Sequence, residues 1–229
     1  MAGSVIFLVE LTLPVEKTFM QGPEFLKFAG QIIVKDWKQH GKAMLGTVTG
    51  MALGILFVRR FGPDQAIAKG IVIGAGVVCP YGFSQLCFFI ERQHGLLKKL
   101  MMPPITPREL LLAKYGSAFS MAIFVVSVPA MLFWDVGFLC YINIAVLFLT
   151  SICMLIAVVS DLPWATLVPI WIVLFPYFYA RSWLDTVFGF ARFHTTAVCI
   201  AGLSLIPVIV YASLRRFEMD TALDKHRNR

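Results

Sequence analysis

The chain has 229 residues, of which 59% are hydrophobic and only 14% charged, and its formal net charge is +7. A soluble domain averages roughly 45–50% apolar and about 25% charged residues, so this composition indicates an integral membrane protein without a large soluble catalytic domain. The positive charge would favour nucleic acid as a partner of a soluble protein. In a membrane protein, lysines and arginines gather in cytoplasmic loops beside anionic lipid, so we expect no nucleic-acid partner.

The first forty residues lack a convincing signal peptide. We expect residues 1–20 to be a weakly ordered or interface-lying start in the cytoplasm. Residues 24–40 place apolar side chains, among them Phe28 and Ile32, largely at helical spacing with lysines between them. This pattern predicts an amphipathic helix on the inner membrane surface, with Trp37 at headgroup depth. The alternative is that the segment simply extends the first membrane span.

Six apolar runs follow along the chain. A helix needs about 20 mostly apolar residues to cross the hydrocarbon core. The candidate spans are residues 41–58, 66–90, 115–134, 138–160, 164–180 and 195–214. We therefore expect an all-α bundle of six transmembrane helices, forming a single domain over residues 1–229.

The distribution of lysine and arginine predicts the orientation of these spans. With the N-terminus inside, the inner segments carry 15 of the 20 basic residues and the outer segments carry 5. Arg59 and Arg60 do not fit this orientation, since they directly follow the first span and would lie on the outer side. The overall bias favours a multi-pass protein of the cytoplasmic (inner) membrane with both termini in the cytoplasm.

Glycines recur every four residues in the first span, at Gly46, Gly50 and Gly54. Such a stripe opens one helix face, so that another helix can approach its backbone closely. We expect the stripe to mediate packing within the bundle or between subunits. Glycine is also generally common in membrane helices, which is the simpler explanation.

Motifs for autonomous chemistry are missing from the sequence. There is no P-loop, no H-E-x-x-H and no G-x-S-x-G. The five cysteines form no C-x-x-C pair, and the four histidines are not spaced as metal ligands. We therefore predict no catalytic residue, metal or cofactor on this chain. The spans also look almost free of ionisable side chains, which weakens the case for an ion-coupled carrier or a membrane-embedded enzyme.

The most informative segment is the predicted cytoplasmic loop of residues 91–114. It begins with a charged, amphipathic turn and helix, continues through a proline break, and ends with a new helix start. Thr106 can cap that new helix, with Pro107 in its first turn and Glu109 at the third position of a capping box.

This loop resembles that of the type-2 membrane permease family of ABC transporters. The family's inner loop typically reads Glu-Arg/Lys-x-x-Gly-x-Leu-x-x-Leu, then Pro-Ile/Val-Ser/Thr, then x-x-Glu-Leu and a helix with an early lysine. The matching positions are Glu91, Gly95, Leu97, Leu100, Pro104, Ile105, Thr106, Glu109, Leu110 and Lys114. The six spans, the helix at residues 24–40 and the basic ending agree more loosely with the family. The chain departs from it in having short outer loops, and Leu96 where a small polar residue is frequent.

The resemblance implies a function and partners. Two permeases pair, as copies or as sister subunits, and a separate ATPase that binds ATP and magnesium docks beneath each one. The matching residues of the loop, in particular Glu91, Gly95, Leu97, Leu100, Pro104 and Glu109, would then couple the ATPase to the bundle. Carriers of drugs, peptides, lipids and polysaccharides share this layout, usually moving cargo outward. The alternatives are a membrane-embedded enzyme, an ion-coupled carrier working without an ATPase, or a non-catalytic assembly or immunity subunit.

Overall fold

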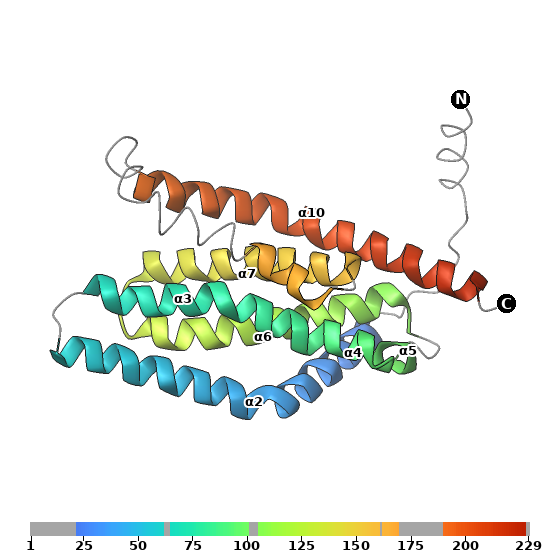
Figure 1. The fold of residues 1–229 in the computed structure, drawn as a ribbon, viewed down its shortest axis with the longest axis horizontal. Helices are drawn as coiled ribbons and strands as arrows, with labels where there is room; N and C mark the ends of the chain where they lie inside the picture. Colours follow the sequence, from blue (N-terminus) through green and yellow to red (C-terminus); the bar gives the residue numbers. More distant parts are fainter. Residues whose placement is uncertain (1–21, 62–64, 101–104, 161, 170–189, 228–229) are drawn as a thin grey trace.

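The computed structural model describes residues 22–61, 65–100, 105–160, 162–169 and 190–227. Within these ranges the regular structure is entirely helical. The long helices are α2 (Gly22–Phe61), α3 (Gln65–Ser84), α6 (Pro107–Met131), α7 (Val136–Val159) and α10 (Phe190–Arg227). The short ones are the π-helical η2 (Gln85–Phe89), α4 (Ile90–Gln93), α5 (Leu96–Leu100) and the 3₁₀-helical η3 (Pro163–Leu167). Figure 1 shows the long helices running lengthwise beside one another.

Four described stretches are long and apolar enough to cross a membrane: Pro23–Phe61, Ile67–Gln93, Pro107–Met131 and Val136–Val159. Length and composition therefore make the chain a membrane-embedded protein, and its described ranges are helical. Most of the predicted fifth span lies outside the described residues, and the predicted sixth span falls within α10. The number of six spans stays a prediction.

Helix α2 joins two segments that the sequence pattern treats separately. Residues 24–40 and 41–58 form one helix of 40 residues, which contains no proline after its first turn and ends just before Gly62 and Pro63. Figure 1 shows this helix bending midway along its length. The interfacial position of its first half stays a prediction.

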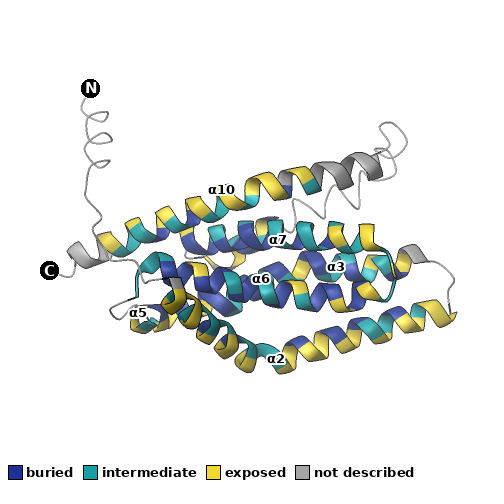
Figure 2. Cartoon of the chain, turned by 180° about the vertical axis from the view of Figure 1, so that it is seen from behind, coloured by how far each residue is buried: buried dark blue, intermediate teal, exposed yellow. Residues whose placement is uncertain are grey.

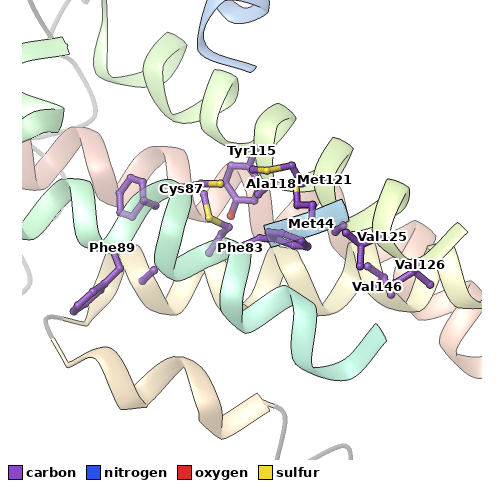
Figure 3. Close-up of a cluster of buried hydrophobic side chains, with 14 of the residues drawn as sticks. Met44, Phe83, Cys87, Phe89, Tyr115, Ala118, Met121, Val125, Val126 and Val146 are labelled. Atoms are coloured by element: carbon purple, nitrogen blue, oxygen red, sulfur yellow. The ribbon is translucent and has the colours of Figure 1, made fainter. Parts of the chain in front are cut away.

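Helix α6 lies at the centre of the bundle and packs against α2, α3, α7 and α10. Its buried residues include Leu110, Met121 and Val125. Figure 3 shows side chains from α2, α3, η2 and α7 meeting this helix, with Phe83 and Cys87 close to Tyr115. By contrast, α2 and α10 turn many exposed residues outward in Figure 2. A central helix buried on most sides explains why α6 is apolar around its whole circumference.

Side-chain hydrogen bonds join the helices at several levels. The indole N–H of Trp37 donates to Ser120 Oγ at 3.0 Å, and the indole ring meets Phe124 edge-on at 5.1 Å. The Tyr115 hydroxyl lies 2.7 Å from Ser213 Oγ and thereby ties α6 to α10. Bonds of this kind between membrane helices contribute on the order of 0.6 kcal/mol each. Trp37 therefore packs on α6, and its depth relative to the headgroups is not fixed by these contacts.

Two glycines outside the predicted stripe permit close helix packing. A Cβ on Gly76 would lie 3.0 Å from Ile142 Cδ1 and 3.1 Å from Val146 Cγ2, where α3 meets α7. A Cβ on Gly202 would lie only 2.6 Å from Ile144 Cγ2, where α10 meets α7. A side chain at Gly202 would require Ile144 to shift, and one at Gly76 would crowd Ile142 and Val146, so both glycines permit the close approach of their helices to α7.

The end of the bundle between α6 and α7 has its own ion pair. Asp135 caps α7 by accepting a hydrogen bond from the Phe138 backbone N–H at 2.9 Å. Lys69 Nζ donates to Asp135 Oδ2 at 2.7 Å. The hydrogen bond from Lys69, followed by the one from the Phe138 backbone, lowers the pKa of the Asp135 carboxyl below its ordinary value.

This lowered pKa predicts a pH-dependent contribution to stability. A carboxyl whose pKa is lower in the folded than in the unfolded state stabilises the fold above its unfolded pKa, and this is lost as pH falls through the folded pKa. Asp135→Asn keeps a capping oxygen but removes the charge. We expect it to lower the melting temperature at neutral pH, with a difference from wild type that shrinks below about pH 4. Thermal unfolding in detergent across this range measures it, and a constant difference would contradict the ion pair's role.

Candidate functional site

The segment between α3 and α6 contains most of the residues that the sequence singles out. It comprises η2, α4, a turn at Gly95, α5 and the start of α6. The π-helical turn η2 is wider than an α-helical turn, a feature often found at functional sites. We call residues 90–100, which include α4 and α5, the loop helices. Figure 1 places them at the same end of the bundle as the first half of α2 and the last turns of α10.

The predicted capping box at the start of α6 is confirmed. The Glu109 backbone N–H donates to Thr106 Oγ1 at 3.3 Å, and the Thr106 backbone N–H donates to Glu109 Oε2 at 2.8 Å. Pro107 occupies the first turn. Because two otherwise unpaired backbone N–H groups are satisfied here, the position where the loop ends and α6 begins is sharply defined.

Gly95 shapes the turn between α4 and α5. Its φ angle is +67°, in the left-handed region that glycine adopts without steric penalty. The N–H groups of His94 and Gly95 donate to the carbonyls of Ile90 and Arg92 at 3.0 and 3.1 Å, which closes α4. The glycine that the family resemblance marks therefore sits at a turn whose backbone conformation favours glycine.

Glu91 points into the bundle rather than toward solvent. It is only 4% exposed, and its Oε1 accepts a hydrogen bond from Lys35 Nζ at 2.7 Å. Its Oε2 lies 2.7 Å from Lys114 Nζ, an ion pair whose angles fall outside those of a hydrogen bond. Glu91 thus connects the loop helices to α2 and to α6 at once.

Lys114 and Asp36 complete the cluster. Both are 0% exposed, and Lys114 Nζ donates to Asp36 Oδ1 and Oδ2 at 3.2 and 3.1 Å. Lys35, by contrast, keeps 42% of its side chain exposed and also lies 4.0 Å from Asp36. We call Lys35, Asp36, Glu91 and Lys114 the buried charge cluster. It carries two positive and two negative groups, so its formal charges balance.

The charges of this cluster balance and each is paired, which offsets the cost of burying them in an apolar bundle. A buried charge is expensive to desolvate, and only well-placed partners offset that cost. Removing one partner from a buried pair costs about 3–5 kcal/mol because the other charge is left uncompensated. The cluster therefore holds α2, α4 and α6 in one arrangement, and a different arrangement of these helices would have to separate the charges.

Arg92 of α4 forms hydrogen bonds with a further helix, α7. Its Nη1 donates to the carbonyls of Ala157 and Val158 at 3.0 and 2.8 Å, at the end of α7. Carbonyls at the end of a helix lack partners within it and carry partial negative charge, so a guanidinium stabilises them. A further ion pair, between Arg108 and Glu218, joins the start of α6 to α10.

The remaining predicted loop residues divide into buried and exposed ones. Leu97 is 2% exposed, and Leu100 is half-buried against the same core. Leu96 is 40% exposed, while His94 and Lys99 are also exposed. Pro104 lies outside the described residues. The loop helices thus have an inner side that contacts the bundle and an outer side that is free of it.

The three glycines of the stripe differ in whether another helix lies beside them. A Cβ on Gly46 or Gly50 would meet nothing within 4 Å, whereas one on Gly54 would meet Ile71 Cδ1 of α3 at 3.6 Å. Of the predicted apolar face of residues 24–40, Ile32 is buried and Phe28 packs against the core. Close packing through Gly46 and Gly50 inside one chain does not occur in the described part of the structure.

Sequence reasoning missed the pairing of Asp36 with Lys114, which are 78 residues apart. The expectation that the spans are almost free of ionisable groups covered residues 41–58 and 115–134, and both charges lie just outside those ranges. They nevertheless lie inside the long apolar helices α2 and α6, which extend beyond the predicted spans. One signal could have found them. Asp36 lies four residues after the apolar Ile32, and Lys114 lies four after Leu110, so each falls on a buried helix face.

The cluster does not resemble a metal centre. In the described ranges, no group of three or more histidine, cysteine, aspartate or glutamate side chains is placed to hold a metal ion. What the arrangement can do is mechanical and electrostatic: it couples the position of the loop helices to α2, α6 and α7. Comparison of the chain with models of protein families, with curated proteins and with solved structures gave no match.

Proposed function

We propose that this chain is the transmembrane permease subunit of an ATP-driven ABC exporter, in which the loop helices receive the movement of a separate ATPase. The chain forms the translocation path with a second permease, a copy or a sister subunit, and itself binds neither ATP nor magnesium. The family resemblance of residues 91–114 motivates the proposal. The apolar helices support its membrane setting.

The observation that carries the proposal is the set of polar contacts between the loop helices and three long helices, α2, α6 and α7. Glu91 is paired with Lys35 and Lys114, and Arg92 is bonded to the end of α7. A force applied to the outer side of α5, at Leu96 for example, therefore reaches α2, α6 and α7 through short polar contacts. A loop serving only as a connection would not need to be tied to three helices.

The charge distribution supports a cytoplasmic position for this end of the bundle. Lys99 belongs to the loop helices, and Arg215 and Arg216 directly precede the part of α10 whose Phe217 contacts Phe88 and whose Glu218 pairs with Arg108. Excess lysine and arginine mark the cytoplasmic side of a membrane protein. In this orientation the ATPase docks from the cytoplasm, both termini are cytoplasmic, six spans cross the inner membrane, and the first half of α2 lies along the inner interface.

The outward face of α2 is the surface that we assign to the second permease. It carries Gly46 and Gly50 together with exposed leucines and a phenylalanine: Leu45, Leu53, Leu56 and Phe57. Small residues on such a face let two helices approach closely without polar contacts.

Gly50→Leu tests this assignment. A Cβ at Gly50 meets nothing within the chain, so the fold of the single subunit should melt as in the wild type. Pairing should fall, because leucine fills the face that the partner approaches. Crosslinked dimer yield in membranes measures the effect. Gly41→Leu is the matched control, on the same helix but outside the stripe and equally uncrowded. A dimer yield equal in all three proteins would exclude this face as the contact.

The buried charge cluster also favours a second candidate, an ion-coupled carrier acting without an ATPase. Carriers keep ionisable side chains inside the membrane to bind the coupling ion. In this chain, however, each carboxylate of the cluster is already paired with a lysine. A carrier would move protons or cations in vesicles that contain this chain alone, and Glu91→Gln would abolish that movement.

The decisive experiment is isolation of the full chain from its native host after mild crosslinking in the membrane. We expect an ATPase subunit in near-equal amount. Crosslinking before solubilisation keeps a weakly docked partner attached. Isolation without any ATPase would overturn the permease proposal and leave the carrier as the candidate to pursue.

A further inference from the structure

The first half of α2 has a lysine-rich face, along which the surface is open and only shallowly hollowed. A surface hollow of about 720 Å³ is lined by Lys27, Gly30, Gln31, Val34, Lys35, Lys38 and Gln39. The described lining contains three lysines and two amides but no carboxylate. Lys27 and Lys38 are exposed, and neither has an acidic partner among the residues that the structure describes. Such a lining suits a negatively charged ligand.

A second, apolar hollow adjoins the first. It has a volume of about 440 Å³ and is lined by Ile33, Val34, Trp37 and Lys38. Val34 and Lys38 line both hollows. A ligand that fills both must therefore combine an anionic group with an apolar chain.

The cationic character of this face follows from helical spacing. At about 100° per residue, Lys27, Lys35, Lys38 and the exposed Lys42 fall within about 80° of one another around the helix. Asp36, the acidic residue next to them in sequence, is turned inward and held by Lys114. Glu24 lies one turn before Lys27 and does not line either hollow. Burying Asp36 thus leaves the outer face with a surplus of positive charge.

We propose that this face binds one anionic phospholipid. Its anionic headgroup lies on the face between Lys27 and Lys38, a stretch of about 16 Å that includes Gln31, and an acyl chain lies along the adjoining apolar side at Val34 and Trp37. Basic pockets on membrane proteins bind anionic headgroups in this way. The proposal concerns a binding site on the permease subunit and holds whether or not an ATPase is present.

The adjoining apolar hollow is the reason for choosing a lipid over other anions. Free phosphate would use the lysines alone, and an acidic peptide would need further cations in place of Ile33 and Trp37. The chain is membrane-embedded, so phospholipid is also present at high local concentration. Lys35 lies between the lipid site and the buried charge cluster, since its Nζ contacts Glu91 while its side chain remains partly exposed.

Native mass spectrometry of the full chain can count retained lipid. The protein is purified in mild detergent after incubation with equal amounts of phosphatidylglycerol and phosphatidylcholine. We expect the wild type to keep phosphatidylglycerol preferentially. Lys27→Gln combined with Lys38→Gln should reduce that retention by about 25-fold, because each lysine near an anionic phosphate contributes about fivefold in affinity.

Two further variants make the test specific. Arg59→Gln combined with Arg60→Gln removes the same charge from the other end of α2 and should leave retention unchanged. Lys27→Arg combined with Lys38→Arg should restore binding, which shows that charge rather than folding is measured. Equal loss in the arginine-to-glutamine control would overturn the proposal. Displacement of the lipid by millimolar inorganic phosphate would also overturn it. A third contradicting result would be binding of polyglutamate at these lysines without preferential retention of phosphatidylglycerol.

Discussion

Lys114→Met should be the most destabilising single substitution in the described part of the chain, with a loss of about 3–5 kcal/mol. Methionine fits the volume of the lysine stem but removes the fully buried ammonium that lies 3.1 Å from Asp36 Oδ2 and 2.7 Å from Glu91 Oε2. The cluster would then hold two carboxylates against one half-exposed lysine. Equilibrium unfolding in detergent, followed by the loss of helical signal, measures the change.

A second substitution in the same chain separates charge from packing. Asp36→Asn added to Lys114→Met leaves Lys35 facing Glu91, so the charges balance again. We expect this double variant to be more stable than Lys114→Met alone, although it contains one substitution more. Lys35→Met is the surface comparison and should cost less, because the Lys35 side chain is 42% exposed. A double variant less stable than the single one would show that shape, not charge balance, governs this site.

Glu91→Ala should uncouple a bound ATPase from the bundle without displacing it. The substitution removes the carboxylate that joins the loop helices to α2 and α6 while leaving the outer side of α5 unchanged. We expect substrate-stimulated ATP hydrolysis to fall within the range of about 5–150-fold that is typical of coupling between sites. Membrane insertion and co-isolation of the ATPase should persist. Unchanged stimulation would remove the coupling role from Glu91.

Leu96→Asp should displace a bound ATPase without disturbing the bundle, the opposite of the effect expected for Glu91→Ala. Leu96 is an exposed apolar residue on the loop helices, where a docking partner would bury it. A charge there should prevent co-isolation of the ATPase while leaving the stability of the bundle unaltered. Met219→Asp is the matched control, an exposed apolar residue of α10 outside the loop. If both aspartates reduced co-isolation equally, the loop helices would not be the docking surface.

The local features of this fold were readable from the sequence because they depend on neighbouring residues. The predicted span 138–160 agrees closely with α7 (Val136–Val159), since an unbroken apolar run bounded by Asp135 and Ser160 leaves little freedom. The start of α6 was predicted at Thr106 from its capping box. The separation of residues 24–40 from 41–58 had no such local marker, and the helix continues through Gly41.

The site itself depends on contacts between distant segments, which the sequence pattern does not contain. Asp36 and Lys114 look like ordinary loop or interface charges until α2 and α6 are brought together. The coupling role of Glu91 stays a prediction, and its burial against two lysines was not anticipated. Packing between subunits through Gly46 and Gly50 stays a prediction, whereas the close approach of Gly76 and Gly202 to α7 was not anticipated, because it depends on which helices become neighbours.

The length of α2 gives the molecule a lever. Forty residues of helix extend about 60 Å, roughly twice the thickness of the hydrocarbon core. The first half of α2 is held at Lys35 and Asp36 by Glu91 and Lys114, and the far end carries Arg59, whose guanidinium lies 4.9 Å from the centre of the Phe133 ring. A small displacement of α2 at Lys35 and Asp36 therefore moves the other end of the same continuous helix, on the far side of the bundle. The bend midway along α2 determines how much of the displacement reaches that end.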